Sequence, residues 1–342
     1  MTDPLDELEI EVDVRLVRDR EVILDGRLAE LLKAISKTGS LLAAAKLIGI
    51  SYSKAWRSIT SLERRLGTSI IAPKRGGKYG GGTTLTENGR KLLSIYLKAE
   101  KELGIAKKSI EGSIERPDLL IAGSHDLLLE RAVGVLRGRV EIHWIGSYGG
   151  LLSMMMGDAD ISGIHLLDTA SGEYNEPIVR RLFPTGSVRL LRGYEREVGW
   201  AVRRDIEFHT ADLLEGRVVL ANRNRGSGTR LLLDSALSRI AGELGIEPGE
   251  VRDRVRGYER EFFTHTDACR AVAEGKADVT LTIRPVAEIY GLSFVPIGWE
   301  RYDLVVNERV SEEILRSIFD VIRKEKPPNG YRIGEDLGKR IL

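Results

Sequence analysis

The chain has 342 residues, of which 42% are hydrophobic and 30% are charged, with a formal net charge of +1. This length predicts two or three domains, while an acidic N-terminal stretch and the lack of an apolar run of roughly 18–20 residues exclude a signal peptide and a membrane span. A single cysteine, Cys269, excludes an internal disulfide and favours a reducing, cytoplasmic setting.

Positive charge is concentrated towards the N-terminus. Residues 27–91 hold 13 lysines and arginines against three acidic residues, whereas residues 116–342 hold 32 against 35. A basic block on a slightly acidic body predicts a surface that contacts nucleic acid. The alternative is an ordinary solvated surface, and only the local residue pattern distinguishes the two.

Three helices are predicted within the basic block. Apolar residues over 28–35 repeat at the i, i+3, i+4, i+7 spacing of an amphipathic helix. Gly39 ends this helix and Ser40 caps the next, while Gly49 makes a tight turn before Ser51 begins the third. Two helices joined by a short glycine turn, with small alanines at their crossing, are typical of a helix-turn-helix.

The third of these helices presents polar and basic groups where a recognition helix meets base edges and phosphates. The segment after it predicts a hairpin with a glycine-rich basic tip, which is typical of the wing of a winged helix. The predicted DNA contacts are Ser51, Tyr52, Ser53, Lys54, Arg57 and Ser58 on the helix and Lys74, Arg75 and Lys78 on the wing. The alternative, a helical core with an incidental hairpin, explains fewer of these features together.

A resemblance to the N-terminal domain of ModE-type molybdate-responsive regulators is carried by TGSLLAAAKLIGISYSKAWRSI and GGKYGGGTTLTENGRKLL. Over about residues 25–95 the chain is also broadly similar to the winged helix of LysR-type regulators. The resemblance implies a winged helix-turn-helix over residues 1–85 that binds double-stranded operator DNA. It also implies a linker helix over residues 86–115 that pairs subunits, so a homodimer or higher homo-oligomer is expected, with a monomeric linker as the alternative.

Beyond Pro117, strands and helices alternate. A buried strand is predicted at 119–122 and an alternating strand at 140–144, each followed by a helix, and a short run at 218–220 leads into a glycine-rich loop. A glycine, then Ala-Asp and a strand, occurs twice, in GDADISGIH and GKADVTLTI, which suggests two lobes built alike. Parallel α/β units place ligand groups at the carboxyl ends of strands, and at those ends lie Ser124, Ser147, His165 and Ser227.

The chain also contains the motifs GSHD, GIHLLD, YNEPIV, NRNRGSGTRLLLD, GYEREFFTHTDACRAVAEGKAD and GLSFVPIGWERYDLVV. Through them it resembles type II periplasmic-binding-protein domains, and more specifically the molybdate- or tungstate-binding-like domain that is fused to winged helices in prokaryotic regulators. This resemblance implies an α/β two-lobed ligand-sensing domain over residues 116–342, with its second lobe at about 199–296, preceded by the winged helix-turn-helix and a long linker helix.

The loop NRNRGSGTR predicts an anion site, because a strand, a glycine-rich loop and a helix N-terminus form the usual cradle for an anion. A tetrahedral dianion only accepts hydrogen bonds, so hydroxyl and backbone N–H groups must surround it. The predicted ligand-binding residues are Ser124, His125, Ser147, Tyr148, Arg225, Ser227, Gly228, Thr229, Arg230, Thr264 and His265. Together with the resemblance, this set predicts a small oxyanion effector, molybdate or tungstate, with sulfate, phosphate or an organic acid as the alternative and no cofactor.

Some of these residues have a second interpretation. Arg225 and Arg230 either neutralise the charge of the anion or pair with Asp267 or Glu261 as structural ions. The Thr264 stretch is either another donor loop or a helix cap. The histidines His125, His165 and His265 lie in separate loops without metal-ligand spacing, so hydrogen bonding is favoured over a metal site.

Catalysis is not expected. A nucleotide-binding P-loop requires a Gly-Lys-Ser/Thr sequence, whereas Thr229 is followed by Arg230. Ser124, His125 and Asp126 are contiguous, whereas the members of a hydrolytic triad meet only through the fold, so a serine hydrolase is a remote alternative. The sequence therefore predicts a ligand-responsive, DNA-binding transcriptional regulator.

Overall fold

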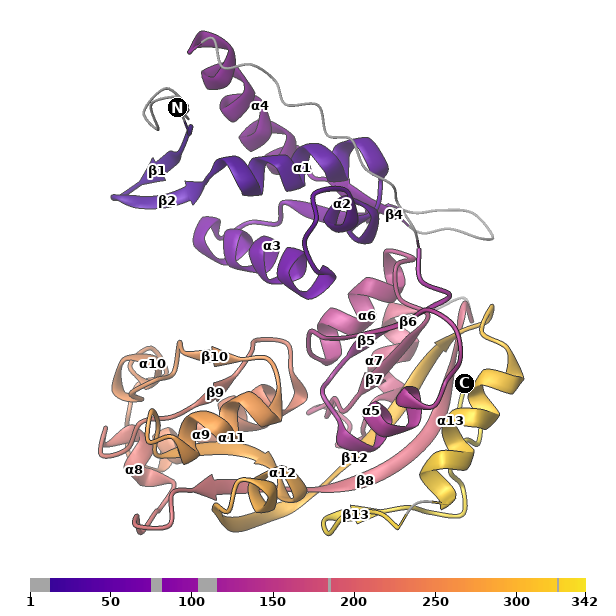
Figure 1. Ribbon diagram of the computed structural model, residues 1–342. Coiled ribbons are helices and arrows are strands. Elements are labelled where there is room, and N and C mark those ends of the chain that lie inside the picture. Colours follow the sequence, from indigo (N-terminus) through magenta and orange to yellow (C-terminus); the bar gives the residue numbers. More distant parts are fainter. Residues whose placement is uncertain (1–12, 75–81, 104–115, 184–185, 325) are drawn as a thin grey trace, which may run out of the picture. The chain divides into compact units, whose positions relative to one another are not determined.

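The computed structural model describes residues 13–74, 82–103, 116–183, 186–324 and 326–342. The chain divides into two compact units, one containing the N-terminal residues to Arg116 and the other most of the remainder (Figure 1). The predicted wing contacts Arg75 and Lys78 lie outside the described residues, as does the second half of the predicted linker helix. Within the described ranges, no helix is long and apolar enough to cross a membrane.

The first unit is a small helical domain with two hairpins. Its elements are β1 (Leu16–Arg18), β2 (Glu21–Leu24), α1 (Gly26–Thr38), α2 (Leu41–Leu47), α3 (Tyr52–Leu66), β3 (Ile71–Lys74), β4 (Gly82–Leu85) and α4 (Glu87–Glu102). The side chains of Asp25, Ser40, Ser51 and Thr86 each accept a backbone N–H in the first turn of the following helix, which fixes where the four helices begin. The predicted helix-turn-helix and wing strands are confirmed, whereas the β1–β2 hairpin was not predicted.

Helix α4 packs on this domain through a narrow face. Tyr96, on the helix expected to pair subunits, is only 3% exposed and lies beneath the ammonium of Lys33, which is 5.4 Å from the ring centroid. Ile95 and Leu103, by contrast, are 50% and 63% exposed. The apolar residues of α4 are therefore shared between the core of the domain and its surface.

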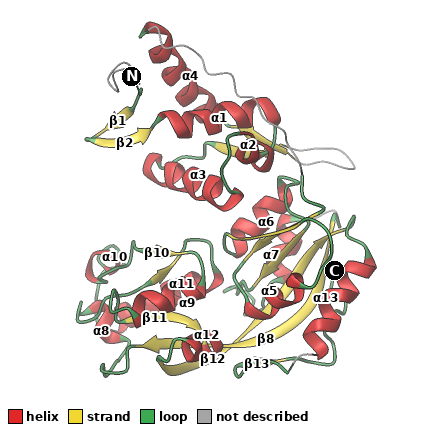
Figure 2. Ribbon diagram, viewed as in Figure 1, coloured by secondary structure: helices red, strands yellow, loops and turns green. Residues whose placement is uncertain are grey.

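The second unit is built on one seven-stranded mixed sheet (Figure 2). Its strands are β5 (Leu119–Gly123), β6 (Val140–Trp144), β7 (Ile161–Ile164), β8 (Val188–Val202), β11 (Val279–Ile283), β12 (Ser293–Asn307) and β13 (Tyr331–Arg332), with β9 (Asn222–Arg223) and β10 (Glu261–Phe262) forming a separate pair. Its helices are α5 (Leu127–Gly134), α6 (Ser147–Met155), α7 (Glu176–Leu182), α8 (Ala211–Leu214), α9 (Gly228–Glu243), α10 (Val251–Arg254), α11 (His265–Ala273), α12 (Arg284–Ile289) and α13 (Glu312–Lys324). Strand β5 pairs in parallel with β6 and β7, and β12 pairs antiparallel with β7 and β8.

Two long strands join the two lobes of this unit. Figure 1 shows β8 and β12 running as one antiparallel ribbon from the lobe of β5, β6 and β7 into the lobe of α9 and α11. Where they cross, Gly199 lies so close to the carbonyl of Val295 that a β-carbon would overlap it, and the pairing shifts register between Pro296 and Gly298. The predicted fold class, a winged helix-turn-helix followed by an α/β two-lobed domain, is confirmed.

The strand predicted at 218–220 is shorter than expected. Only Leu220 forms a bridge, in parallel with Val279, and the regular strand β9 begins two residues later at Asn222. The apolar run is buried against β11, whereas the polar residues after it pair with β10. Thr264 is the N-cap of α11, which begins at His265.

Candidate functional site

The outer face of α3 carries most of the predicted DNA contacts. Ser51, Lys54 and Arg57 are exposed, and Ser53 and Ser58 are half-buried. Tyr52 departs from the prediction, because its side chain is 2% exposed and its ring lies 6.2 Å from that of Trp56 on the inner face of the helix. A residue that packs inside the domain has no surface to offer to DNA.

A hollow of about 630 Å³ lies between α1 and α3. Its lining includes the basic side chains of Arg27, Lys54, Arg57 and Arg65 together with the hydroxyls of Ser58 and Ser61. The acidic residue in the lining is Asp25, whose carboxylate already caps α1. This surface is electropositive and rich in donors, which suits phosphate and base contacts. Lys74 is not part of this hollow: it is exposed at the end of β3, in the hairpin that forms the wing.

Three of the predicted strand-end residues meet in the second unit. The Oγ of Ser124 lies 2.8 Å from Nε2 of His165, and the backbone N–H of His165 donates to Oγ of Ser147 over 3.2 Å. All three residues are 1% exposed or less. The first turn of α9 closes on them, because a β-carbon on Gly228 would overlap the carbonyl oxygen of His165. Ser227 caps that helix by accepting the N–H of Arg230.

The loop between β9 and α9 also touches the other lobe directly. The backbone N–H of Tyr148 donates to the carbonyl of Gly226 over 3.0 Å, and the amide of Asn224 donates to the carbonyl of Ile145 over 3.4 Å. The side chain of Tyr148, in contrast, is 39% exposed. The two lobes are therefore in contact at this loop, and Tyr148 contributes its backbone rather than its hydroxyl.

Behind His165 lies a buried ionic network that the sequence reasoning missed. Its Nδ1 is 2.8 Å from Oε2 of Glu300, whose other oxygen accepts from Arg196 over 2.5 Å. Arg196 also reaches Asp126 over 3.1 Å, and the side chains of these four residues are 0% exposed. Burial opposes ionisation of Glu300, but its interactions with His165 and Arg196, which include hydrogen bonds from both, hold its pKa down at about 2. Charged residues inside the apolar strands β8 and β12 were the signal for this network.

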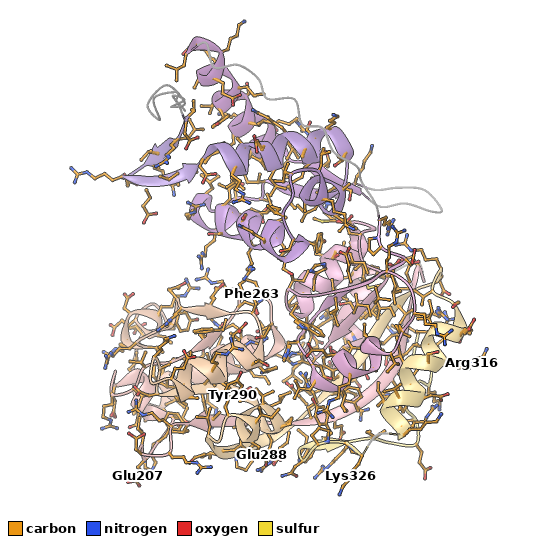
Figure 3. All side chains as sticks on the ribbon, in the orientation of Figure 1. Glu207, Phe263, Glu288, Tyr290, Arg316 and Lys326 are labelled. Atoms are coloured by element: carbon orange, nitrogen blue, oxygen red, sulfur yellow. The ribbon has the colours of Figure 1, made fainter. Side chains whose placement is uncertain are left out.

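Arg223 is a second functional candidate that was missed. Its side chain is buried, Nε donates to the carbonyl of Phe262 and Nη2 to that of Phe263, labelled in Figure 3, over 3.2 and 3.0 Å. Its Nη1 has no hydrogen-bond partner, and among the described residues no carboxylate forms an ion pair with it. Burial and then the charge of Arg196 lower the pKa of Arg223 to about 9, so the guanidinium remains charged at neutral pH.

Other buried polar atoms in this unit also have no hydrogen-bond partner. Thr229 Oγ1 and His265 Nε2 are buried without a hydrogen bond, while Nδ1 of His265 lies 2.9 Å from Oγ1 of Thr282. Burial, followed by the charges of Arg223 and Arg196, lowers the pKa of His265 well below its ordinary value, so its imidazole is neutral. His125 stacks edge-on against Trp144 and also keeps Nδ1 without a partner.

Three predicted ligand residues have other partners in the structure. Arg225 is exposed and pairs with Glu259 at 2.9 Å, and more loosely with the expected Glu261 at 3.6 Å. Arg230 pairs with Asp234 one turn along α9, rather than with Asp267 or Glu261, and its guanidinium lies 4.1 Å over the ring of Tyr258.

Thr264 accepts the N–H of Asp267 and donates to its carboxylate over 2.7 Å, as a helix cap does. The hydroxyl therefore has both its hydrogen bonds within α11. Of the two interpretations of the Thr264 stretch, this geometry is that of a cap.

The order Ser124, His165, Glu300 matches the hydrogen-bond order of a hydrolytic triad. Here, however, the carboxylate is shared with Arg196, and Ser124 is 0% exposed. In the parts of the chain that the structure describes, no three His, Cys, Asp or Glu side chains are placed to hold a metal ion. The chemistry that the site offers is anion binding by buried donors and one buried positive charge.

Comparison with known proteins gives two family matches. The family described as PBP superfamily domain matches residues 134–323, and the family described as bacterial regulatory helix-turn-helix protein, lysR family, matches residues 27–90. The chain is 29% identical over 216 residues to the uncharacterized protein YvgK of Bacillus subtilis (strain 168), covering 61% of this chain and 67% of YvgK. It is 36% identical over 89 residues to the transcriptional regulator ModE of Yersinia pestis, covering 26% of this chain and 34% of ModE.

Among solved structures, full-length BenM is similar at 17% sequence identity, with 89% of this chain and 99% of BenM covered and a TM-score of 0.37. By contrast, the match to ModE covers only about a third of the length of that relative.

Proposed function

We propose that the chain, which belongs to the PBP superfamily and matches the lysR-family helix-turn-helix over residues 27–90, is a ligand-responsive DNA-binding transcriptional regulator whose effector is the oxyanion molybdate or tungstate. The N-terminal unit binds double-stranded operator DNA through α3 and the wing. The anion binds in the second unit, where residues from both lobes meet. Binding at both lobes at once favours the closed arrangement over an open one.

The observation that carries this proposal is the buried, carboxylate-free guanidinium of Arg223. A charge taken out of water costs several kcal/mol unless an opposite charge accompanies it. An anion beside Nη1 supplies that charge, and the unpartnered groups of Thr229 and His265 supply neutral donors. The hydroxyls of Ser147 and Ser227 each accept one backbone N–H and retain a hydrogen to donate.

Two observations favour a metal oxyanion over an organic acid. The donor set consists of a guanidinium, an imidazole and hydroxyls, which suit a ligand that only accepts hydrogen bonds. The sequence also resembles ModE-type regulators over the helix-turn-helix, and a relative that matches over 89 residues is a transcriptional regulator ModE. Both support molybdate or tungstate as the effector.

We also propose that the protein acts in the cytoplasm as a homodimer formed through α4. Ile95 and Leu103 expose apolar surface on that helix, which a second copy would cover. Two-fold operators place two recognition helices one helical turn of DNA apart, which requires paired subunits.

Isothermal titration of the full chain with molybdate, tungstate, sulfate, phosphate and succinate tests the effector class. We expect molybdate or tungstate to bind most tightly. If succinate binds and no inorganic oxyanion does, the proposed effector is wrong. DNA binding is tested by fluorescence anisotropy with fragments upstream of the gene and of molybdate-transport genes, where salt-independent binding, or binding to none of them, contradicts the proposal.

A further inference from the structure

The hydrogen bonds behind Ser124 fix the position of every hydrogen in that part of the site. Both oxygens of the Glu300 carboxylate only accept, one from Arg196 and the other from Nδ1 of His165. Nδ1 therefore carries the hydrogen, and in a neutral imidazole Nε2 then has a lone pair. Since Nε2 is 2.8 Å from Oγ of Ser124, the serine hydroxyl must donate to it.

The surroundings of His165 keep its imidazole neutral in the unliganded site. The titratable and charged groups that face it are Glu300 and Tyr302 on β12, Arg196 on β8, Arg223 on β9, and His265 on α11. Burial lowers the pKa of His165 most, Glu300 raises it, and Arg196 and Arg223 lower it again, with a net shift below the ordinary value. A nearby anion would add a negative charge to this balance and so favour the imidazolium.

This direction of the Ser124 hydroxyl hydrogen is unfavourable for a ligand that can only accept hydrogen bonds. Because the Ser124 hydroxyl hydrogen is directed at His165, its Oγ offers lone pairs to the site, and lone pairs repel the oxygens of a fully deprotonated oxyanion. A proton from solvent on Nε2 removes the conflict. The imidazolium then donates from Nε2 to Oγ, the serine hydroxyl turns, and its hydrogen points at the anion.

We propose that the hydrogen-bonded residues Ser124, His165 and Glu300 determine whether a proton is taken up when the effector binds. A fully deprotonated oxyanion binds together with one proton taken up by His165, whereas an anion that carries its own hydroxyl hydrogen donates it to Ser124 and binds without uptake. His165 is thus a specificity-determining residue that does not contact the anion itself. This inference rests on the proposed function, because it concerns the same anion site.

Proton uptake is measured by titrating molybdate into the full chain in buffers of different ionisation enthalpy between about pH 7 and pH 9, where molybdate stays deprotonated. We expect about one proton per molybdate, with the association constant rising about tenfold for each pH unit lowered. His165→Asn has no ring to protonate and removes the uptake. His209→Asn, an exposed histidine of the same unit, retains it.

Two outcomes overturn the inference. If wild-type protein binds molybdate without proton uptake, Ser124, His165 and Glu300 do not determine proton uptake, although the proposed function stands. If no oxyanion binds at all, the proposed function and this inference fail together. A measurement on the free protein is independent of how the variants fold: the ¹⁵N spectrum of the histidine rings must show His165 as the Nδ1–H tautomer, and an Nε2–H tautomer contradicts the argument.

Discussion

Gly228 and His165 meet so closely across the two lobes that the glycine has no room for a side chain. A β-carbon at position 228 would overlap the backbone oxygen and ring of His165. The first turn of α9 therefore approaches His165, in the proposed anion site, only because position 228 is glycine, and the two lobes are in contact here.

Gly228→Ala is expected to keep the lobes from closing. The domain should still fold, because the clash is relieved by separating the lobes, but oxyanion affinity should fall by at least about tenfold, or 1.4 kcal/mol. Titration calorimetry and thermal unfolding check both parts. Gly242→Ala is the matched control on the same helix, since nothing lies within 4 Å of its β-carbon, and it should leave affinity unchanged. Equal affinity in both variants would contradict the contact.

Arg223→Met tests the buried positive charge. We expect oxyanion affinity to fall by about 2–5 kcal/mol, as for truncation of one partner of a buried charge pair. Stability should change little, because removing the charge offsets the loss of two hydrogen bonds worth about 1 kcal/mol each. Arg225→Met, which removes an exposed arginine paired with Glu259, should bind normally. Normal binding by Arg223→Met would exclude Arg223 as the anion partner.

Arg196→Met is expected to destabilise the second unit by about 3–5 kcal/mol at neutral pH, because Asp126 and Glu300 lose their shared buried partner. Denaturant unfolding measures this. Arg301→Met breaks the half-exposed pair with Glu195 and should cost less than about 1 kcal/mol.

The ion pair between Arg196 and Glu300 also predicts how the stability of the second unit depends on pH. In the wild type the pKa of Glu300 is lowered from 4.5 to about 2, so its stabilising contribution is complete above pH 4.5 and is lost as the pH falls through 2. Without Arg196 the pKa of Glu300 rises, and acid protonates the orphaned carboxylate. The stability gap between wild type and Arg196→Met should therefore narrow as the pH falls from neutral towards 4.5. A gap independent of pH would mean that the loss is one of packing.

Arg57→Ala should weaken operator binding and reduce its salt dependence. If Arg57 contacts a phosphate, the slope of log affinity against log salt falls by about 0.9, and if it contacts a base edge, discrimination falls by about 1–3 kcal/mol. Fluorescence anisotropy at several salt concentrations separates the two. Arg15→Ala, an exposed arginine on the N-terminal side of β1, is the control of equal charge. Equal losses in both variants would indicate a general charge effect.

Ile95→Asp should separate the proposed dimer into monomers, because it places a charge in the apolar surface that a second copy would cover. Sedimentation equilibrium measures the mass. Lys98→Asp changes a charge on the same helix at an exposed position and should leave the mass unchanged. A monomeric wild-type protein would rule out pairing through α4.

The sequence was most informative where structure depends on neighbouring residues. Ser40, Ser51 and the turn at Gly49 are local signals, and the second and third helices begin where they indicate. The β1–β2 hairpin was not predicted, because its turn has Asp19 and Arg20 at positive φ, whereas the residues that usually indicate such a turn are Asn and Gly.

The candidate site was less predictable, because its partners are distant in the chain. His165 meets Ser124 and Glu300 across separations of 41 and 135 residues, and a single sequence carries no signal for such pairing. The loop between β9 and α9 was predicted to be an anion site, but the sequence did not indicate which of its arginines is buried. Arg223 ends a strand inside the domain, whereas Arg225 follows in a turn that faces solvent.

Glu300 lies on β12 between the crossing of the lobes and the stretch Asp303–Val306 that pairs with β7. β7 ends at Ile164, immediately before His165. Any change of twist in the ribbon of β8 and β12 therefore moves the carboxylate and the imidazole that bond each other. If the proposed proton uptake by His165 accompanies anion binding, movement of the lobes and protonation of His165 would be coupled through the paired strands β7 and β12.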